Sequence, residues 1–403
     1  MSPDSEQLIQ IAREFGTPVY IYHADKIKEQ YQKLQKAFSG CSTRFFYACK
    51  ALSNINVLRY IRSLGAGLDC VSIYEVKLGM LAGFEPRNIL FTPNGVDLEE
   101  IIQAKDLGVL LNIDNISTLE QFGNRFGDSY PICIRLNPHI MAGGNYKTST
   151  GHMDSKFGIS IHQIRHIERI VKTFKIHVNG LHMHTGSDIK DVNVFIQGLE
   201  IMFEDARHFD RLEFIDLGSG FKVPYQEGEP ETDVEALGKS VCSAFNAFIK
   251  EYGRPLEVWF EPGKYLVSEA GYFVVKANII KQTTATVFVG VNSGFNHLIR
   301  PMFYDSFHRI ENLSNPGGPE RIYTVVGNIC ETDTFAWDRK LNEVREGDLL
   351  VFYNAGAYGF QMSSNFNSRL KPAEVLLSEG KARLIREREV FEDLLRGQID
   401  ESI

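Results

Sequence analysis

From residue 44 onward, short apolar runs rich in β-branched and aromatic residues alternate with longer stretches in which apolar residues recur every three or four positions. Such runs are typical of buried parallel strands, and the longer stretches are typical of helices that pack on a sheet. Eight runs occur, at residues 44–51, 67–72, 88–93, 109–114, 131–137, 177–184, 212–220 and 258–264. Eight strand–helix units in about 220 residues predict an α/β fold, the (βα)8 TIM barrel.

After residue 270 this rhythm stops, and short strand-like runs follow one another through turn-rich connections. They lie at residues 276–282, 284–291, 321–328, 348–354, 373–379 and 381–387. The run at 18–24 is expected to join the same sheet, and residues 389–399 are expected to form a terminal helix. We therefore predict a barrel at 24–266 and a discontinuous all-β domain, sandwich-like or barrel-like, at 1–23 and 267–403.

The composition narrows the class of partner. The 403 residues carry 43 Lys and Arg against 51 Asp and Glu, a net charge of -8, which disfavours a nucleic-acid or anionic-membrane surface. No apolar run reaches about 18 residues and the first residues lack a secretory-signal pattern, so we expect a soluble, cytoplasmic protein. The six cysteines are scattered without a C-x-x-C pair, so neither a zinc site nor a disulfide framework is expected.

In a barrel of this kind, the chemistry takes place at the carboxyl ends of the strands. Reactive or small residues stand at these ends, namely Lys50, Asp69, Arg135, Asn137, His182, His184, Ser187, Gly218, Ser219, Gly220, Glu261, Gly263 and Lys264. The small residues 218–220 would let backbone N–H groups approach a phosphate. A desolvated Lys50 would have a lowered pKa and could form a Schiff base with an aldehyde, and Glu261 could hold a proton on a pyridine nitrogen.

A metal-dependent hydrolase is the rival interpretation. His182 and His184 stand two apart on one strand and could ligate zinc from the same face. The pair lies on the sixth predicted strand, however, and the fifth and eighth strands supply no matching His or Asp. We therefore expect no metal site, and we interpret His184 as a flat ring stacked on a cofactor and His182 as a structural residue.

Four motifs in one order carry a resemblance: Lys50, HMHTGS at 182–187, GSG at 218–220 and EPGK at 261–264. The sequence resembles the fold-type III pyridoxal phosphate-dependent decarboxylases over nearly its whole length. The long segments 299–308, 325–341 and 355–376 resemble the members that act on diaminopimelate. This resemblance implies decarboxylation of meso-2,6-diaminopimelate to L-lysine and CO2, the last step of lysine biosynthesis.

The resemblance also implies the cofactor, pyridoxal 5'-phosphate, and the residues that bind it. Lys50 should carry the Schiff base, His184 should stack on the ring, Glu261 should face the pyridine nitrogen, and Tyr358 should reach the phosphate or the substrate. Ser187 and the 218–220 loop should bind phosphate. The full expected set is Lys50, Asp69, Arg135, His184, Ser187, Gly218, Ser219, Gly220, Glu261, Gly263, Lys264 and Tyr358.

The implied substrate-binding residues are Lys264, Arg300, Tyr304, Glu331 and Tyr358. Diaminopimelate presents a second amino-acid head, which needs a cation for its carboxylate and an anion for its ammonium, and Arg300 and Glu331 supply both signs. Cys330 resembles the proton donor, which in this family comes from the partner subunit. A homodimer with shared active sites is therefore expected, and the catalytic residues would be Lys50, His184 and Cys330.

Two departures from the family pattern stand out. The usual G-G-G is here Gly218-Ser219-Gly220, which is tolerated if the middle residue keeps φ below zero. The usual E-P-G-R is here EPGK, so Lys264 supplies a point charge instead of a bidentate fork. Decarboxylases of ornithine, arginine or carboxynorspermidine remain alternatives within the family. A non-catalytic pyridoxal phosphate carrier would not need both Lys50 and Cys330.

Overall fold

The structure is a computed structural model that describes residues 3–140, 150–152 and 154–401. The first two and last two residues of the expected β domain lie outside this described part. The chain divides into two compact units, one of residues 28–224 and 230–266 and one of residues 1–27, 225–229 and 267–403. Residues 225–229, which fall inside the range expected for the barrel, group with the second unit.

The first unit is the predicted barrel. Its eight main strands are β2 (Thr43–Ala48), β3 (Gly67–Cys70), β4 (Ile89–Phe91), β5 (Leu110–Ile113), β6 (Ile132–Asn137), β8 (Val178–His182), β9 (Phe214–Asp216) and β10 (Glu257–Phe260). They pair in parallel in the order β5-β4-β3-β2-β10-β9-β8-β6, and the pairing of β5 with β6 closes the ring. A two-residue strand, β7 (Ile159–Ser160), adds to β6. The predicted fold class is confirmed.

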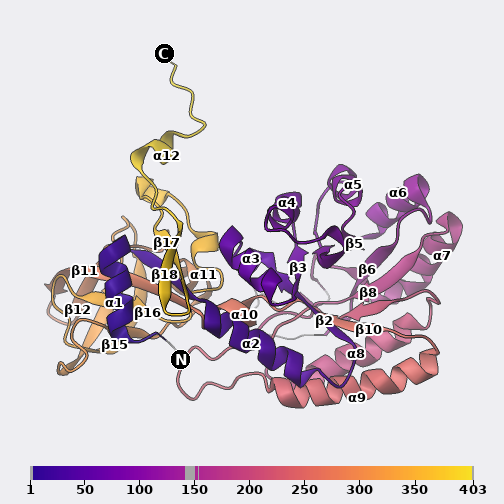
Figure 1. Cartoon of the computed structure of the whole chain (residues 1–403), viewed down its shortest axis with the longest axis horizontal. Helices are drawn as coiled ribbons and strands as arrows, with labels where there is room; N and C mark the ends of the chain where they lie inside the picture. The colour runs from indigo at the N-terminus through magenta and orange to yellow at the C-terminus, as the bar shows by residue number, and fades with distance from the viewer. Residues whose placement is uncertain (1–2, 141–149, 153, 402–403) are drawn as a thin grey trace. The chain divides into compact units, whose positions relative to one another are not determined.

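Helices lie on both sides of these strands in Figure 1, as a barrel requires. They are α2 (Ala24–Ala37), α3 (Ile55–Ser63), α4 (Ile73–Leu81), α5 (Leu98–Asp106), α6 (Ile116–Phe126), α7 (Ile164–Phe174), α8 (Val192–Ala206), α9 (Val234–Tyr252) and the short α10 (Lys264–Val267). Most begin at a capping residue; the Ser72 hydroxyl, for example, accepts a hydrogen bond from Glu75 N. None of the helices in the described ranges is long and apolar enough to cross a membrane.

The barrel interior is packed with side chains. Phe46, Phe214 and Trp259, from three different strands, form one core cluster, and the rings of Phe214 and Trp259 stack with centroids 3.5 Å apart. Gly180 lies against this pair, and any side chain there would overlap the Phe214 ring. The barrel is therefore a solid support for the groups at its strand ends.

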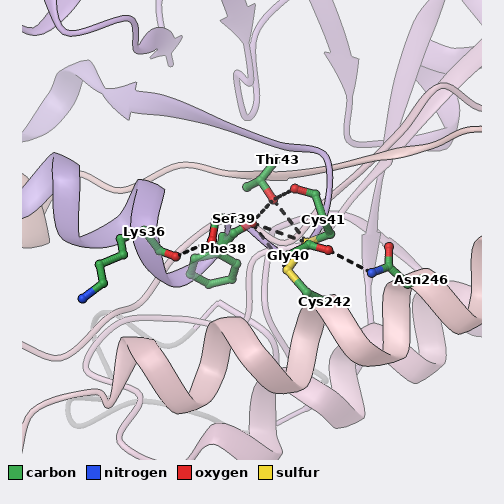
Figure 2. Close-up of a disulfide and its surroundings, with 8 residues drawn as sticks. All are labelled: Lys36, Phe38, Ser39, Gly40, Cys41, Thr43, Cys242 and Asn246. Carbon is green, nitrogen blue, oxygen red and sulfur yellow. Dashed lines mark hydrogen bonds between the residues drawn. A yellow bond between two sulfur atoms is a disulfide. The ribbon is translucent and has the colours of Figure 1, made fainter.

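A disulfide joins Cys41, just before β2, to Cys242 on α9, with a Cα–Cα distance of 5.1 Å (Figure 2). Asn246, one turn further along α9, donates a hydrogen bond of 2.9 Å to the Gly40 carbonyl. The expectation of no disulfide was therefore wrong. The two cysteines are 201 residues apart, and only the closure of the barrel brings the start of β2 to α9. The free cysteines of the barrel, Cys49, Cys70 and Cys133, are buried.

The second unit is built around one sheet that uses both ends of the chain. Its strands are β1 (Val19–His23), β11 (Gly271–Gln282), β12 (Val287–Val291), β13 (Ile310–Asn312), β14 (Glu320–Val326), β15 (Thr334–Asn342), β16 (Leu349–Phe352), β17 (Ala373–Ser378) and β18 (Lys381–Arg386). As predicted, β1 joins this sheet, pairing antiparallel with β11 and parallel with β17.

Three details of this unit differ from the prediction. Residues Ser5–Phe15 form a helix, α1, whose first turn is capped by the Asp4 carboxylate and whose buried face includes Leu8 and Ile11. Strands β13 and β15 were not predicted, because β13 has only three residues and the exposed half of β15 carries a run of charged residues. The terminal helix, α12, spans only Phe391–Leu395, and Gly397 follows it with φ of 81°.

Candidate active site

Lys50 and Asp69 lie side by side at the ends of two neighbouring strands. The 3-10 turn Cys49–Ala51 follows β2 and presents Lys50, whose Nζ lies 3.9 Å from Asp69 Oδ2. Asp69 is fully buried, whereas the Lys50 side chain is 40% exposed, so Lys50 is less desolvated than the sequence argument assumed. Burial and the neighbouring Glu261 raise the pKa of Asp69 to about 7, against the opposing effect of Lys50.

Gly263 supports the turn that carries Lys50. A Cβ atom at this glycine would lie 3.0 Å from the Cβ of Ala48 and 3.3 Å from that of Ala51. The backbone after β10 therefore runs close against the turn, and Ala48 N donates a hydrogen bond to the Pro262 carbonyl at 3.4 Å. A larger residue at 263 would push the ends of β2 and β10 apart.

Two further carboxyl groups, Asp216 at the end of β9 and Glu261 just after β10, are buried beside His182. Potential ligand atoms of these three residues lie within 4.8 Å of one another, and His182 Nε2 is 3.1 Å from Glu261 Oε1. Burial raises the pKa of Glu261, while Lys50 and Arg135 oppose that rise. Burial and then Glu261 raise the pKa of Asp216 well above its ordinary value.

Arg135 and His182 complete this buried group. Arg135, on β6, is 7% exposed, and its guanidinium carbon lies 4.9 Å from the centre of the Phe157 ring. Burial and then Arg135 hold the pKa of His182 well below 6.5, so this histidine is neutral. A divalent cation bound among His182, Asp216 and Glu261 would be repelled by the neighbouring Lys50 and Arg135.

His184 is fixed by the loop after β9. Ser219 N donates a hydrogen bond of 3.2 Å to His184 Nδ1, and burial and Lys50 lower the pKa of this ring well below 6.5. His184 is therefore a neutral ring whose proton resides on Nε2, and its Nδ1 is not available to a metal. Among the described residues, the group whose atoms could meet at a metal joins His182 to Asp216 and Glu261 and does not include His184.

The 218–220 loop needs glycine at its two ends. Gly218 has φ of 64°, and a Cβ there would lie 2.6 Å from His184 Nδ1. Gly220 has φ of 119°, and a Cβ there would overlap the Gly186 carbonyl. Ser219 has no positive φ, which confirms that serine is tolerated in the middle. Ile189 N donates to the Gly220 carbonyl at 2.8 Å, so the loop lies beside the segment that carries Ser187.

Lys264 forms an ion pair with Asp188, and both side chains are largely buried. The two residues stand at the start of α10 and in the segment after β8. The Lys264 charge, which was expected to bind a phosphate or a carboxylate, is therefore partly neutralised by Asp188.

In the second unit, Arg300 is surrounded by tyrosines. It begins the short helix α11 (Arg300–Tyr304), is 7% exposed, and its guanidinium carbon lies 5.4, 5.8 and 5.9 Å from the ring centres of Tyr225, Tyr304 and Tyr358. Its Nε is buried without a hydrogen-bond partner among the described residues. Three predicted substrate residues, Arg300, Tyr304 and Tyr358, are thus brought together.

Cys330 and Glu331 lie on the exposed loop between β14 and β15. Asp333 holds the base of this loop, because its carboxylate accepts hydrogen bonds from Phe295 N at 2.7 Å and Ile329 N at 3.1 Å. Cys330 N donates a hydrogen bond of 3.0 Å to Asn367 Oδ1, and Cys330 is a free, exposed cysteine. A single chain does not enclose Cys330.

Sequence reasoning missed Asp216 and Tyr225. Asp216 is the last residue of β9 and stands two residues before Gly218, so the rule that pointed to Asp69 and Glu261 could have found it. Tyr225 carries no comparable signal, because it lies in a loop and reaches Arg300 only through the fold.

Comparison with known proteins places this site in context. The family model described as "Pyridoxal-dependent decarboxylase, pyridoxal binding domain" matches residues 24–268. The chain is 40% identical to the diaminopimelate decarboxylase of Methanothermobacter thermautotrophicus, over 97% of this chain and 93% of that protein. It is 37% identical to that of Campylobacter jejuni, over 95% and 96%.

Solved structures agree with these relatives. Diaminopimelate decarboxylase from Helicobacter pylori, complexed with L-lysine, matches with a TM-score of 0.89 and 32% identity, covering 98% of each chain. The enzyme from M. jannaschii, also in complex with L-lysine, matches with a TM-score of 0.89 and 30% identity over 98% of this chain and 94% of that one.

Proposed function

The chain belongs to the pyridoxal-dependent decarboxylases, within the diaminopimelate decarboxylases, and we propose that the predicted site residues carry out its reaction. The reaction is removal of CO2 from meso-2,6-diaminopimelate to give L-lysine. One observation carries the assignment of the site: the Lys50 amine and the buried Glu261 carboxyl stand at the ends of the paired strands β2 and β10, beside a glycine loop.

The barrel residues fit pyridoxal 5'-phosphate. The 218–220 loop has glycine at both ends, where a side chain would collide with His184 or the Gly186 carbonyl. A loop of such small residues lets backbone N–H groups approach a phosphate, together with Ser187. Glu261 Oε1 is buried and accepts no hydrogen bond within the described residues, which suits a ring nitrogen that brings a proton. When bound, the cofactor supplies an aldehyde for the Lys50 amine and a ring that accepts the electron pair left by departing CO2.

The protein's own groups then set the charges around that ring. Burial raises the pKa of Glu261, whereas Lys50 and Arg135 act in the opposite direction and favour its ionised form. An ionised Glu261 would keep a proton on the ring nitrogen. Asp69, 3.9 Å from Lys50, orients its amine and can share its proton. His184, held neutral with its proton on Nε2, offers a flat ring face without adding a charge.

We propose that the predicted substrate residues bind the distal head of the substrate. The Arg300 guanidinium lies within a tyrosine cluster and has an unpaired buried Nε among the described groups, so it can bind the distal carboxylate, with Tyr304 and Tyr358 beside it. Glu331 would bind the distal ammonium. Lys264 would act at the phosphate or carboxylate as one half of its pair with Asp188.

We propose Cys330 as the proton donor, working in a homodimer. Its thiol is exposed on a single chain, whereas a proton donor needs an enclosed site, and a second copy would supply that enclosure. Cys330→Ala should abolish turnover and leave cofactor binding intact, and gel filtration should give the dimer mass.

Two other expectations from the sequence stay predictions. They are a cytoplasmic location and the domain limits, 24–266 for the barrel and 1–23 with 267–403 for the β domain.

The test of function compares substrates on the purified holoenzyme. CO2 release is measured with meso-diaminopimelate, ornithine, arginine and carboxynorspermidine, together with the visible absorbance of the bound cofactor before and after each addition. We expect lysine and CO2 from meso-diaminopimelate alone. Faster CO2 release from another amino acid would show that the enzyme prefers a different substrate. Stoichiometric zinc in protein without the visible absorbance would favour the metal-dependent hydrolase.

The matched variants are Lys50→Ala and Lys190→Ala. Lys50→Ala should lose both the visible absorbance and the activity, because no other amine is proposed to bond the aldehyde. Lys190 is exposed and has been given no part in the site, so its loss should change neither. An unchanged spectrum in Lys50→Ala would refute the role of this lysine.

A further inference from the structure

We propose that Asp216 is a positioning residue of the barrel site, whose carboxyl oxygen holds the turn at Leu217–Ser219 and thereby sets the places of His184, Glu261 and the phosphate-binding loop. No sequence motif used above includes Asp216, and no role in binding or proton transfer has been given to it. The inference rests on the proposed function, since it names what aligns the parts of that site.

Among the described residues, the side chain of Asp216 accepts a hydrogen bond from the turn that follows β9. Asp216 is the last residue of β9 and is 0% exposed, and its Oδ1 accepts a hydrogen bond of 2.8 Å from Gly218 N. Gly218 follows with φ of 64°, a conformation in which the chain turns sharply away from the strand. The carboxyl group therefore spans the turn at its start.

The same turn contacts two other groups of the site. Ser219 N donates to His184 Nδ1 at 3.2 Å, and the Gly218 carbonyl accepts a hydrogen bond of 2.6 Å from Glu261 N. A shift of the turn would move the His184 ring and the backbone of Glu261 together. By accepting a hydrogen bond from Gly218, Asp216 thus influences the positions of both His184 and Glu261.

Stability alone gives a poor reason for a carboxyl group at this position. Its second oxygen, Oδ2, is buried without a hydrogen-bond partner among the described residues, and Glu261 lies within 4.8 Å, so burial of the group is costly. A protonated Asp216 adds no charge against Glu261 and still accepts a hydrogen bond through Oδ1. An amide has the same shape and the same acceptor, so asparagine should replace it.

The test uses Asp216→Ala and Asp216→Asn in the full chain. Hydrogen exchange of the apoprotein is followed in a peptide that covers residues 217–220, and the dissociation constant of pyridoxal phosphate is measured by titration of the same preparations. For Asp216→Ala we expect at least tenfold faster exchange in this peptide and at least tenfold weaker cofactor binding. For Asp216→Asn we expect both quantities within about threefold of wild type.

Asp205 provides the matched control. It is a buried aspartate of the same unit, on α8, and its Oδ2 also lacks a hydrogen-bond partner among the described residues. Asp205→Ala should leave both the exchange of 217–220 and the cofactor affinity unchanged. A peptide that covers β1 in the second unit should exchange as in wild type in every variant.

Three results would overturn the inference. The first is an Asp216→Ala variant that matches wild type in exchange and affinity. The second is an Asp216→Asn variant as impaired as Asp216→Ala, which would show that the charge of the carboxyl group matters and not its hydrogen-bond acceptor. If the alanine variant does not fold, rapid exchange at Gly218 in the wild-type apoprotein would also refute the hydrogen bond. A wild-type apoprotein that binds no pyridoxal phosphate would refute the proposed function, while the exchange data would still decide the role of Asp216.

Discussion

The disulfide between Cys41 and Cys242 should contribute strongly to the stability of the barrel unit. It closes a loop of 201 residues, and the chain entropy removed from the unfolded state by a loop of that length corresponds to about 5 kcal/mol at 25 °C. The cross-link joins the segment before β2 to α9, which leads into β10, and the pairing of β2 with β10 is one of the contacts that close the ring. Reduction should therefore destabilise the barrel.

The assay is urea unfolding with and without dithiothreitol. With a denaturant slope of about 3 kcal/mol per molar urea, a loss of about 5 kcal/mol lowers the midpoint by about 1.7 M. Cys41→Ser/Cys242→Ser should unfold at the reduced midpoint and should not respond to dithiothreitol. Cys330→Ala, which removes an exposed thiol, should keep both the midpoint and the response of wild type.

A thiol titration in denaturant gives an independent check. The chain has six cysteines, and the disulfide leaves four free thiols in protein purified without reductant. Six free thiols, or a midpoint that does not change on reduction, would refute the stabilising cross-link. Because the cross-link lies outside the strand-end groups, turnover in the absence of urea should be the same in oxidised and reduced protein.

Three further predictions concern the charges of the site. Glu261→Gln should lower kcat by about 10²-fold or more while the cofactor stays bound, because a neutral amide cannot hold the ring proton; near-normal kcat would contradict this role. Asp188→Asn frees the Lys264 ammonium and should tighten pyridoxal phosphate binding by about threefold in a fluorescence titration, whereas weaker binding would show that Asp188 orients the lysine. The pKa of Asp69, raised to about 7, means that the folded state keeps a proton that the unfolded state loses above about pH 4, so its stabilising contribution falls as the pH rises from about 4 to 7. The free energy of unfolding, measured with urea from pH 4 to 8, should therefore fall less steeply with pH in Asp69→Asn than in wild type. The same pH dependence in both proteins would refute this effect of Asp69.

The barrel was predictable because each strand carries its own apolar signal and each strand end carries its own polar residue. Lys50, Asp69 and Glu261 were found by position alone, since parallel strands in a closed ring must place their carboxyl ends on one rim. The tolerance of Ser219 was also predictable, because the loop requires positive φ only at the glycines on either side. These are local properties of backbone conformation and hydrophobic periodicity.

Other features depend on contacts between distant parts of the chain. The Cys41–Cys242 disulfide, the Lys264–Asp188 pair and the tyrosines around Arg300 each join residues that no local spacing connects. The position of Asp216 at a strand end could be read from the sequence, but the hydrogen bond that its carboxyl group accepts from Gly218 N depends on the turn. The helix α1 was missed because its apolar face is short and becomes stable only against the sheet of its own unit.

The sequence by itself thus determined the order of strands and helices, the positions of the reactive side chains along them, and the family to which those motifs belong. Only the tertiary structure decided which charges neutralise one another, which ring nitrogen of His184 carries its proton, and which oxygens are buried without a partner among the described residues. The physical reason is that periodicity and turn preference act over a few residues, whereas burial, ion pairing and pKa depend on groups that meet only after the ring has closed.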